Sequence, residues 1–367
     1  MKATVATDTL KATVRLAARA LPSKSPLPIL GNLRIDANHD GTLDVAATDL
    51  ETHLTVSCAA RVTADDAALV VPGALLAGWL DTMSGGEVTL DQAGTKLRAK
   101  CGGSTAQFAT ADIEAFPVWP ALGDAWLIQP ASALQAAVAA VVPAAATDET
   151  RPVLAAVQIA VQNGALTLAA ADGFRLMTST IAGEAAAGEA LVPLRVLKLL
   201  LAALAGEKPE TPVGLHLSAN VIGFKTERFT LTGRRVEGQF PDWRRIVPQT
   251  GTAVTLPADD LLAALRSCSP FARSNSRIVR VSGDDDTLTL AARDMDGASD
   301  VVATLEAAVP SAVSFAVNGS YFADALAPFA GGMVTLTNAG PTSAIKLTAD
   351  GSTHLAVLMP MHTEAPR

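Results

Sequence analysis

Apolar and polar residues follow more than one pattern along this chain. A two-residue alternation, as in residues 335–337 and 346–348, predicts half-buried β-strands. Other segments are typical of helices, and a short strand is expected directly before each of them. The expected helices are residues 9–20, 132–145 and 259–268, and the strands before them are residues 3–6, 126–129 and 253–256.

Local signals mark where these elements begin and end. Side-chain oxygens that can cap a helix stand near the expected starts, at Asp8 or Thr9, Ser132 and Asp259. Turn dipeptides separate the strands, and they are Asp40-Gly41, Asn163-Gly164, Ser282-Gly283 and Asp350-Gly351. The chain is therefore expected to consist of short elements joined by tight turns.

The pattern occurs three times. Three similar octets, residues 42–49, 165–172 and 287–294, each end in an aspartate, and these aspartates are about 122 residues apart. Each unit is expected to run strand, helix, three strands, helix and further strands. This order predicts an α+β fold with helices on one face of the sheet. The predicted units are residues 1–122, 123–250 and 251–367.

Composition narrows the class of protein. The 367 residues include 28 Lys and Arg against 36 Asp and Glu, a net charge of −8, which disfavours tight binding to nucleic acid through bulk charge. A hydrophobic fraction of 49% excludes a disordered chain. The N-terminus shows no signal-peptide pattern, and the unpaired thiols Cys58, Cys101 and Cys268 favour a reducing compartment. We expect a cytoplasmic protein that does not span a membrane.

Catalytic patterns are missing from the sequence. It contains no phosphate-binding glycine loop, nucleophile elbow or HExxH zinc motif, and its five histidines have no metal-ligand spacing. Asp284, Asp285 and Asp286 could hold a cation, but a solvated turn is the favoured interpretation. We therefore expect no catalytic residue, metal or cofactor. An α+β repeat enzyme with an active site in a cleft between units stays a remote alternative.

Five motifs in order along the repeats carry a specific resemblance. They are LPILGNL at residues 27–33, ATDLE at 47–51, DGFRL at 172–176, EGQFPDWRRIVP at 237–248 and VLMPM at 357–361. Together they resemble the bacterial DNA polymerase III β subunit family, the replicative sliding clamps. The resemblance runs from Lys2 to about His362.

The resemblance implies an architecture and a function. Three DNA-clamp units per chain would join head to tail in a homodimeric ring, with helices lining the hole and sheets outside. Such a ring encircles duplex DNA without sequence preference and acts as a processivity factor, not as an enzyme. The implied partners are the polymerase III catalytic subunit, the clamp loader, other polymerases, mismatch-repair proteins and ligase, each bound through a short peptide motif. A nucleoid-associated location follows, and a clamp-like paralogue specialised for repair or inhibitor tolerance is the alternative.

Basic residues on or after the expected helices are the candidates for contact with DNA. Lys11, Arg15 and Arg19 are spaced to form one stripe on the first helix. From charge alone, these residues are best interpreted as an ordinary solvated surface. For the stripe and Lys24, the resemblance favours contact with DNA instead. Residues 73–83, 132–145 and 318–330 carry no Lys or Arg, so the inner surface should be less basic than is usual in the family. The full set is Lys11, Arg15, Arg19, Lys24, Arg151, Arg195, Lys198 and Arg266.

The resemblance also implies an apolar pocket for partner peptides between units two and three. Methionine adapts to varied ligands, and Arg175 and Arg245 could meet acidic groups of the peptide. Without the resemblance, these residues would be taken as core. Phe174 stands where the family often has a polar residue or histidine, so peptide preference could differ. The set is Leu154, Gly173, Phe174, Arg175, Leu176, Pro241, Arg245, Ile246, Val357, Met359, Pro360 and Met361.

A seam between unit one of one chain and unit three of another is the third implied site. Its apolar candidates are Phe108, Phe271 and Ala272. Arg98 and Lys100 could face acidic residues that include Asp296 and Asp300. Ion pairs of this kind contribute orientation more than affinity. An ordinary pair of surface strands is an equally good interpretation of these segments.

Overall fold

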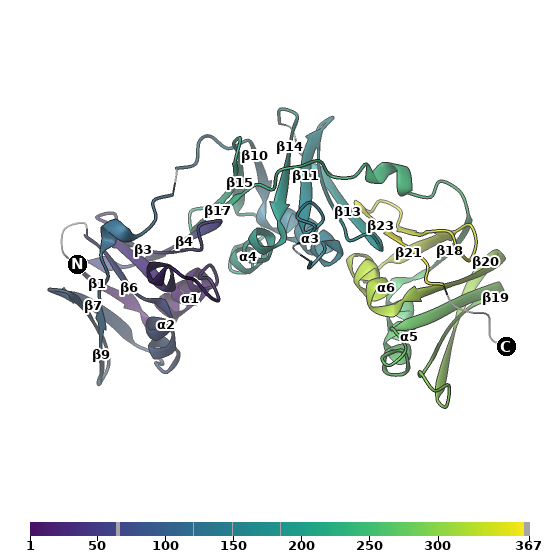
Figure 1. Cartoon of the computed structure of the whole chain (residues 1–367), viewed down its shortest axis with the longest axis horizontal. Helices are drawn as coiled ribbons and strands as arrows, with labels where there is room; N and C mark the ends of the chain where they lie inside the picture. The colour runs from purple at the N-terminus through teal and green to yellow at the C-terminus, as the bar shows by residue number, and fades with distance from the viewer. Residues whose placement is uncertain (64–66, 120, 149, 184, 363–367) are drawn as a thin grey trace. The chain divides into compact units, whose positions relative to one another are not determined.

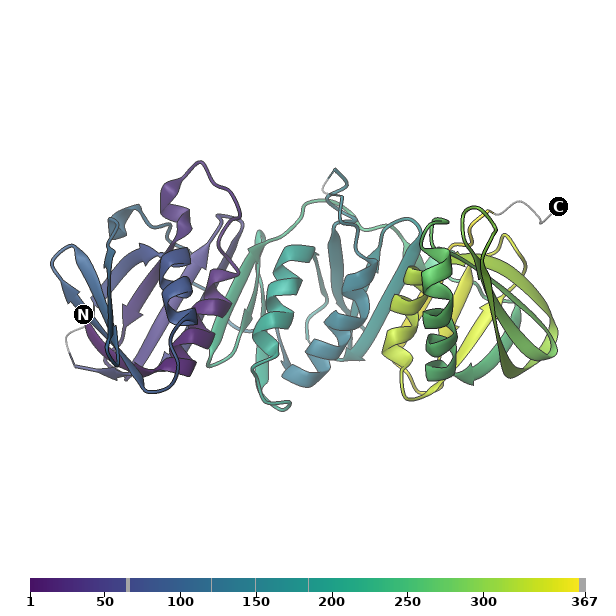
Figure 2. The ribbon, with the colours of Figure 1, turned by 90° about the horizontal axis from the view of Figure 1, so that it is seen from below.

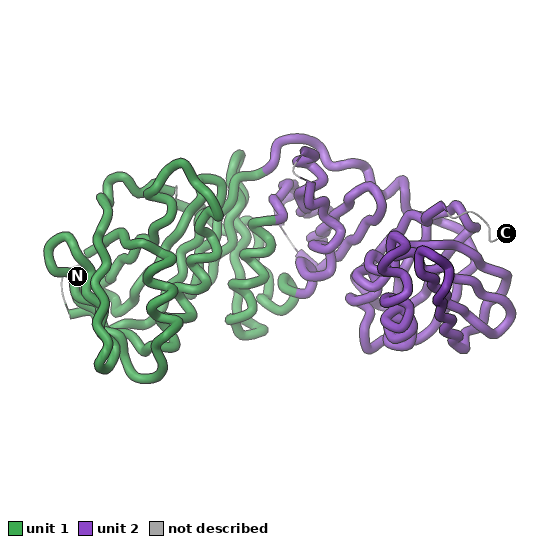
Figure 3. Tube along the Cα trace, turned by 60° about the horizontal axis from the view of Figure 1, so that its bottom comes forward, with its two compact units in different colours: residues 1–135, 195–235 green, residues 136–194, 236–367 purple. Residues whose placement is uncertain are grey.

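The computed structural model describes residues 1–63, 67–119, 121–148, 150–183 and 185–362. Contacts divide the chain into two compact units (Figure 3). Unit 1 contains residues 1–135 and 195–235, and unit 2 contains residues 136–194 and 236–367. These units differ from the predicted repeats, because residues of the middle repeat belong to both. The boundaries at 122 and 250 stay a prediction.

Unit 1 contains two antiparallel sheets, with α1 packed against β3, β4 and the neighbouring helix α2 (Figures 1 and 2). Its helices are α1 (Thr7–Ala18), α2 (Gly73–Asp81) and nearly all of α4 (Leu194–Leu204). The eight-stranded sheet has the order β10 (Leu127–Pro130), β15 (Pro212–Leu217), β16 (Val221–Lys225), β17 (Phe229–Arg234), β4 (Thr52–Ala59), β3 (Thr42–Thr48), β2 (Asn32–Ala37) and β6 (Ala67–Pro72). The five-stranded sheet has the order β5 (Arg61–Val62), β1 (Lys2–Ala6), β7 (Glu87–Ala93), β8 (Lys96–Cys101) and β9 (Ser104–Ala109).

Unit 2 contains an eight-stranded sheet and a long two-stranded ribbon, with α5 against the ribbon and against α6. The sheet has the order β14 (Gly188–Pro193), β11 (Ala156–Gln162), β12 (Ala165–Ala171), β13 (Arg175–Ala182), β23 (His354–Leu358), β22 (Ile345–Thr348), β21 (Met333–Asn338) and β18 (Thr252–Pro257). The ribbon is β19 (Ile278–Arg293) and β20 (Asp300–Asn318), and the helices are α5 (Ala258–Ala272) and α6 (Gly319–Leu326). Helix α3 (Ala131–Val141) is shared by the two units.

The α+β class predicted from the sequence is confirmed. Each eight-stranded sheet takes four strands from the middle repeat and four from a neighbouring repeat. The joins are β17 with β4 in unit 1 and β13 with β23 in unit 2, where Leu176 lies opposite Val357. Both of these side chains are buried, so the join in unit 2 is part of the hydrophobic core.

Predicted helix starts need correction. Helices α1, α3 and α5 begin one or two residues earlier than expected, directly after a strand. Asp8 and Asp259 therefore lie in the first turn, and no side chain caps α1 or α5. Main-chain carbonyls of neighbouring turns accept the first amides instead, as in Ala258 N–H to Gly332 O at 2.9 Å. Ser132 is likewise the second residue of α3.

The predicted turn at Ser282-Gly283 is also wrong. Strand β19 continues through it, and the register with β20 shifts on either side of Asp285, which has a positive φ of 50°. The extra backbone is absorbed in a bulge, so the ladder continues beyond it. The repeats also differ from the expected three strands between helices, since the middle repeat has four (β11–β14) and the third has the two long ribbon strands.

The repeated aspartate has a local structural role. Asp172 Oδ1 accepts the N–H groups of Phe174 and Arg175 at 2.9 and 3.0 Å, and Asp49 Oδ1 makes the same turn 123 residues earlier. The second position of the turn has a positive φ in both copies, 94° at Gly173 and 78° at Leu50. Leucine is disfavoured there because its Cβ crowds the backbone.

Replacing Leu50 with glycine is therefore expected to stabilise unit 1. The left-handed backbone costs a non-glycine residue about 1–2 kcal/mol, part of which is offset by the greater entropy of unfolded glycine. We expect a net gain of about 0.5–1 kcal/mol in the stability of unit 1, measured by hydrogen exchange of β3 and β4, the strands on either side of the turn. Leu50→Ala keeps the Cβ and is the control. Equal stability of the two variants would contradict the strain.

Candidate functional site

The turn before β13 lies against the chain that follows β23. Met359 N–H donates to Phe174 O at 2.8 Å, and Met361 N–H donates to Ala316 O at 2.7 Å. Beside the buried pair of β13 and β23, the side chains of Phe174 and Met359 are 61% and 46% exposed. The structure thus brings the predicted 173–176 and 357–361 segments together and leaves apolar side chains open to a ligand.

Arg175 does not extend freely toward a ligand. Its Nε donates to Asp172 Oδ2 at 3.0 Å and its Nη1 to Asp324 Oδ2 at 2.6 Å. Its guanidinium carbon lies 4.1 Å from the centre of the Tyr321 ring. Only 10% of the Arg175 side chain is exposed. Arg175 therefore links the turn to α6 and positions Phe174, and its guanidinium is not free to bind an acidic group of a peptide.

Tyr321 and Asp324 were missed by the sequence reasoning. They are far from the motif that contains Arg175 along the chain, and only the fold brings α6 beside the turn. One signal was available, because Tyr321 is the single tyrosine of a chain with few aromatic residues. A lone aromatic residue with a polar group often needs a specific partner.

The remaining predicted pocket residues lie on two other segments of unit 2. Pro241, Arg245 and Ile246 belong to or adjoin the short helix η4 (Trp243–Ile246), which Trp243 anchors by donating to Gln158 Oε1 at 3.2 Å. Ile246 is 52% exposed, and Arg245 pairs with Asp242. Half-buried Leu154 donates its N–H to Arg151 O. Among the described residues, no hydrogen bond or ion pair joins η4 to the 172–175 turn.

The stripe on α1 is partly occupied by neighbouring groups. Lys11 Nζ donates to the carbonyls of Asp81 and Met83, at the end of α2, at 3.0 and 3.1 Å. Arg15 Nε pairs with Asp81 Oδ1 at 2.7 Å. Two members of the stripe therefore join α1 to the negative end of α2.

The other DNA-facing candidates fall into two groups. Arg195 pairs with Asp49 at 2.7 Å, and Arg151 pairs with Asp148 at 3.7 Å. Four exposed cations have no ion pair within the described part of the chain, and they are Arg19, Lys24, Lys198 and Arg266. These four keep a full positive charge available to a phosphate.

The seam candidates differ in exposure. Arg98 and Lys100 are on the exposed face of β8, and Asp296 and Asp300 are exposed at the tip of the ribbon. Phe108 is buried in its own unit, with its ring edge-on to Trp79 at 6.3 Å. Ala272 is buried and Phe271 is half-buried. The charged candidates and Phe271 can reach a partner, whereas Phe108 and Ala272 mainly support their own units.

Unit 1 contains a polar cleft of about 350 Å³ that sequence reasoning did not find. His53 lies in it, with its ring stacked on Trp119 at 5.7 Å and its Nε2 3.0 Å from Thr55 Oγ1. Burial and, to a smaller extent, the charge of Arg34 together lower the pKa of His53 to about 4. His53 is therefore a neutral residue that fastens the 116–119 segment to the sheet.

Comparison with known proteins identifies the family. The family model described as "DNA polymerase III beta subunit, N-terminal domain" matches residues 1–120. The model described as "DNA polymerase III beta subunit, central domain" matches residues 129–242. The chain belongs to the DNA polymerase III beta subunit family. The resemblance stated from the five motifs is confirmed.

Individual members of the beta subunit family agree with this assignment. A Beta sliding clamp of Streptomyces coelicolor is 27% identical over 333 residues, which cover 89% of this chain and 88% of the relative. A Beta sliding clamp of Micrococcus luteus is 29% identical over 82% of this chain and 97% of its own length. The solved beta subunit of Thermotoga maritima is 25% identical, with a TM-score of 0.89 over 99% of both chains. A Pseudomonas aeruginosa sliding clamp bound to griselimycin has the same fold, with 22% identity and a TM-score of 0.91 over 99% of this chain and 100% of that one.

Two further features are absent from the described part of this beta subunit chain. In the residues that the structure describes, no group of three or more His, Cys, Asp or Glu side chains is placed to hold a metal ion. No described helix has both the length and the apolar character needed to cross a membrane.

Proposed function

We propose that this chain is a sliding clamp that closes head to tail with a second copy into a ring around duplex DNA. The ring would have helices lining the hole and sheets outside, with no catalytic centre. The observation that carries the proposal is the match to Beta sliding clamps over most of the chain, 89% of it for the Streptomyces coelicolor relative. The role that follows is a processivity factor for a replicative polymerase, acting on nucleoid DNA in the cytoplasm.

Open sheet edges support the proposed dimer. Strand β9 is the last strand of the five-stranded sheet, and β20 pairs only with β19 among the described strands. Unpaired edges of this kind can join across chains. Beside β9, the exposed face of β8 carries Arg98 and Lys100, while acidic side chains including Asp296 and Asp300 lie at the end of the ribbon. Opposite charge would set the register of a head-to-tail join.

Retention on DNA tests the ring. Protein loaded by its clamp loader onto nicked circular DNA should stay bound during gel filtration at moderate salt, and cutting the circle should release most of it. The physical reason is that a closed ring leaves a circle only by opening, whereas its direct contacts with phosphate are weak and screened by salt. Equal retention on circular and linear DNA would contradict topological binding.

We also propose that the surface around Phe174 and Met359 binds short peptides of partner proteins. The main proposed partners are the polymerase III catalytic subunit and the clamp loader. Other polymerases, mismatch-repair proteins and ligase are further proposed partners. Exposed Phe174, Ile246 and Met359 supply apolar contacts in unit 2. Arg175, held by two carboxylates, supplies a fixed turn rather than a contact.

Replacing both Phe174 and Met359 with alanine is expected to weaken peptide binding about tenfold or more, because exposed aromatic and methionine anchors carry much of such binding energy. The measurement is fluorescence anisotropy with a labelled peptide that matches the C-terminal tail of the organism's polymerase. Leu75→Ala is the control, since Leu75 is 65% exposed on α2. Unchanged affinity in the double variant would place the peptide elsewhere.

A further inference from the structure

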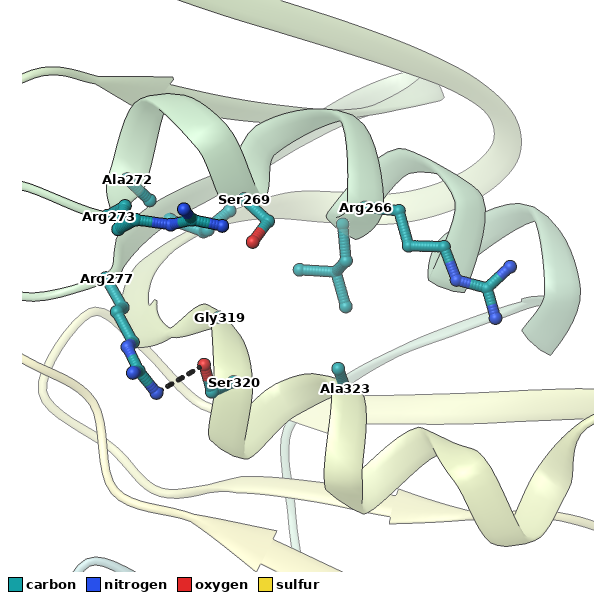
Figure 4. A pocket seen from close by; sticks show the side chains of 10 residues that line it. Arg266, Ser269, Ala272, Arg273, Arg277, Gly319, Ser320 and Ala323 are labelled. Atoms are coloured by element: carbon teal, nitrogen blue, oxygen red, sulfur yellow. Dashed lines mark hydrogen bonds between the residues drawn. The ribbon is translucent and has the colours of Figure 1, made fainter.

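A cavity of about 290 Å³ lies between α5 and α6 in unit 2 (Figure 4). Arg266 and Arg273 come from α5 and its C-terminus, and Arg277 comes from the turn that follows. Ser269 and Ser320 add hydroxyl groups to the lining. These donors form one part of the cavity wall, and apolar residues that include Leu265 and Val279 form the rest.

The charge around this cavity is uncompensated. Its lining contains three arginines and no aspartate or glutamate. None of the three arginines makes an ion pair with a described residue, and all three are exposed. The acidic residues of the same helices, Asp259, Asp260 and Asp324, are not part of its lining. Asp259 accepts the N–H of Gly331, and Asp324 pairs with Arg175. Uncompensated guanidinium groups in one cavity attract an anion, and those of Arg273 and Arg277 lie at the same end of it (Figure 4).

Arg277 is held in place before any ligand arrives. Its N–H donates to Ala272 O at 2.9 Å, and its carbonyl accepts Gly319 N–H at 2.8 Å. Its Nη1 donates to Ser320 Oγ at 3.1 Å, as the dashed line in Figure 4 shows. Its φ of 58° is a left-handed conformation that costs a non-glycine residue energy. A fixed guanidinium loses little entropy when it binds an anion.

We propose that this cavity binds a phosphoryl group through Arg273 and Arg277, which lie together at one end of it, whereas the side chain of Arg266 points away from them (Figure 4). A planar guanidinium matches two phosphate oxygens at once, so a cluster of arginines suits phosphate better than a simple anion. The helix amides of α6 are not the site, because Asn318 Oδ1 already accepts those of Ser320 and Tyr321. A cavity of this volume is at the small end of ligand pockets, which favours a phosphate group over a whole nucleotide.

The phosphoryl group can come from the DNA backbone or from a free phosphate ligand. Binding of a DNA phosphate by this cavity rests on the proposed function, whereas binding of a free phosphate ligand does not. The test variant replaces Arg273 and Arg277 with glutamine, and a second variant replaces both with lysine to keep the charge. The control replaces Lys208 and Lys225 with glutamine, which removes the same charge from exposed positions outside the cavity. Thermal melting confirms that all variants are folded.

Two measurements are made on the full-length protein. Calorimetry with inorganic phosphate should show binding to wild type that falls at least tenfold in the glutamine variant and is partly kept by the lysine variant and fully kept by the control. Anisotropy with a fluorescent duplex over a range of NaCl concentrations should show a log–log slope that is smaller by about one for each backbone phosphate that the variant no longer neutralises.

The outcomes separate the sources and the hypotheses. A smaller slope in the glutamine variant alone supports the backbone as the source. Loss of inorganic phosphate binding with unchanged duplex binding supports a free phosphoryl ligand. A glutamine variant that matches the control in both measurements overturns the proposal. Failure of retention on circular DNA, with phosphate binding intact, would overturn the sliding clamp and not this cavity.

Discussion

Replacing Arg175 with alanine is expected to destabilise unit 2 by about 3 kcal/mol, since removing one partner leaves a charge buried. The carboxylate of Asp172, 11% exposed, would lose its charged partner 3.0 Å away. The stacking on Tyr321 would also be lost. The measurement is hydrogen exchange of residues 175–182, because β13 joins the turn to the sheet and a two-unit chain does not unfold in one step.

Two variants separate the parts of this network. Asp324→Asn should cost less than about 1 kcal/mol, because that carboxylate is 44% exposed and solvent screens its pairing. Arg175→Lys should recover less than half of the loss, since one ammonium cannot match both carboxylates and the ring. Equal effects of Arg175→Ala and Asp324→Asn would show that Asp172 is not an essential partner of Arg175.

Acidification is expected to destabilise unit 1 through His53 by about 3 kcal/mol between pH 6.5 and 4. The pKa of His53 is lowered from 6.5 to about 4 in the folded chain, first by burial and then by Arg34. The unfolded chain therefore takes up a proton on falling pH before the folded chain does. Each unit of pKa shift corresponds to about 1.4 kcal/mol of stability. The contribution of neutral His53 is therefore fully present above pH 6.5 and is lost as the pH falls toward 4.

The comparison of wild type with His53→Gln isolates this contribution. Protonation of aspartates that are hydrogen-bonded in the folded chain destabilises both proteins equally at lower pH. The difference between their two curves of stability against pH is therefore the contribution of His53. The free energy of unfolding of unit 1 should vary less with pH in the variant. The readout is tryptophan fluorescence, because Trp119 stacks on His53. Parallel curves for the two proteins would show that His53 titrates normally.

The sequence predicted the class and the family because each leaves a local or periodic trace. The octets at residues 42–49 and 165–172 form equivalent strands, and the aspartate that ends each octet holds the same turn in both copies. The motif at residues 357–361 was placed correctly beside residues 173–176, because the family implied it. The predicted helix caps were wrong because the first amides of these helices donate to carbonyls of turns that are far away in sequence. The residues near each helix start give no sign of those carbonyls.

The chemistry of individual arginines was harder to predict. A spacing of four residues correctly placed Lys11 and Arg15 on one face of α1, yet it could not show that the end of α2 binds both of them. Arg175 matched a motif, but its partners Tyr321 and Asp324 are about 150 residues away along the chain. Whether a basic side chain is free depends on partners that the tertiary fold brings to it. The sequence around that side chain does not indicate those partners.

The absence of Lys and Arg from three helices has a consequence for movement along DNA. Helices α2, α3 and α6 carry no Lys or Arg, and several basic side chains elsewhere are paired within the chain. Each contact with a phosphate must break and re-form when a ring advances by one base pair, so every free cation adds friction. A ring with few of them would diffuse quickly in one dimension and would rely on closure alone to stay on its template.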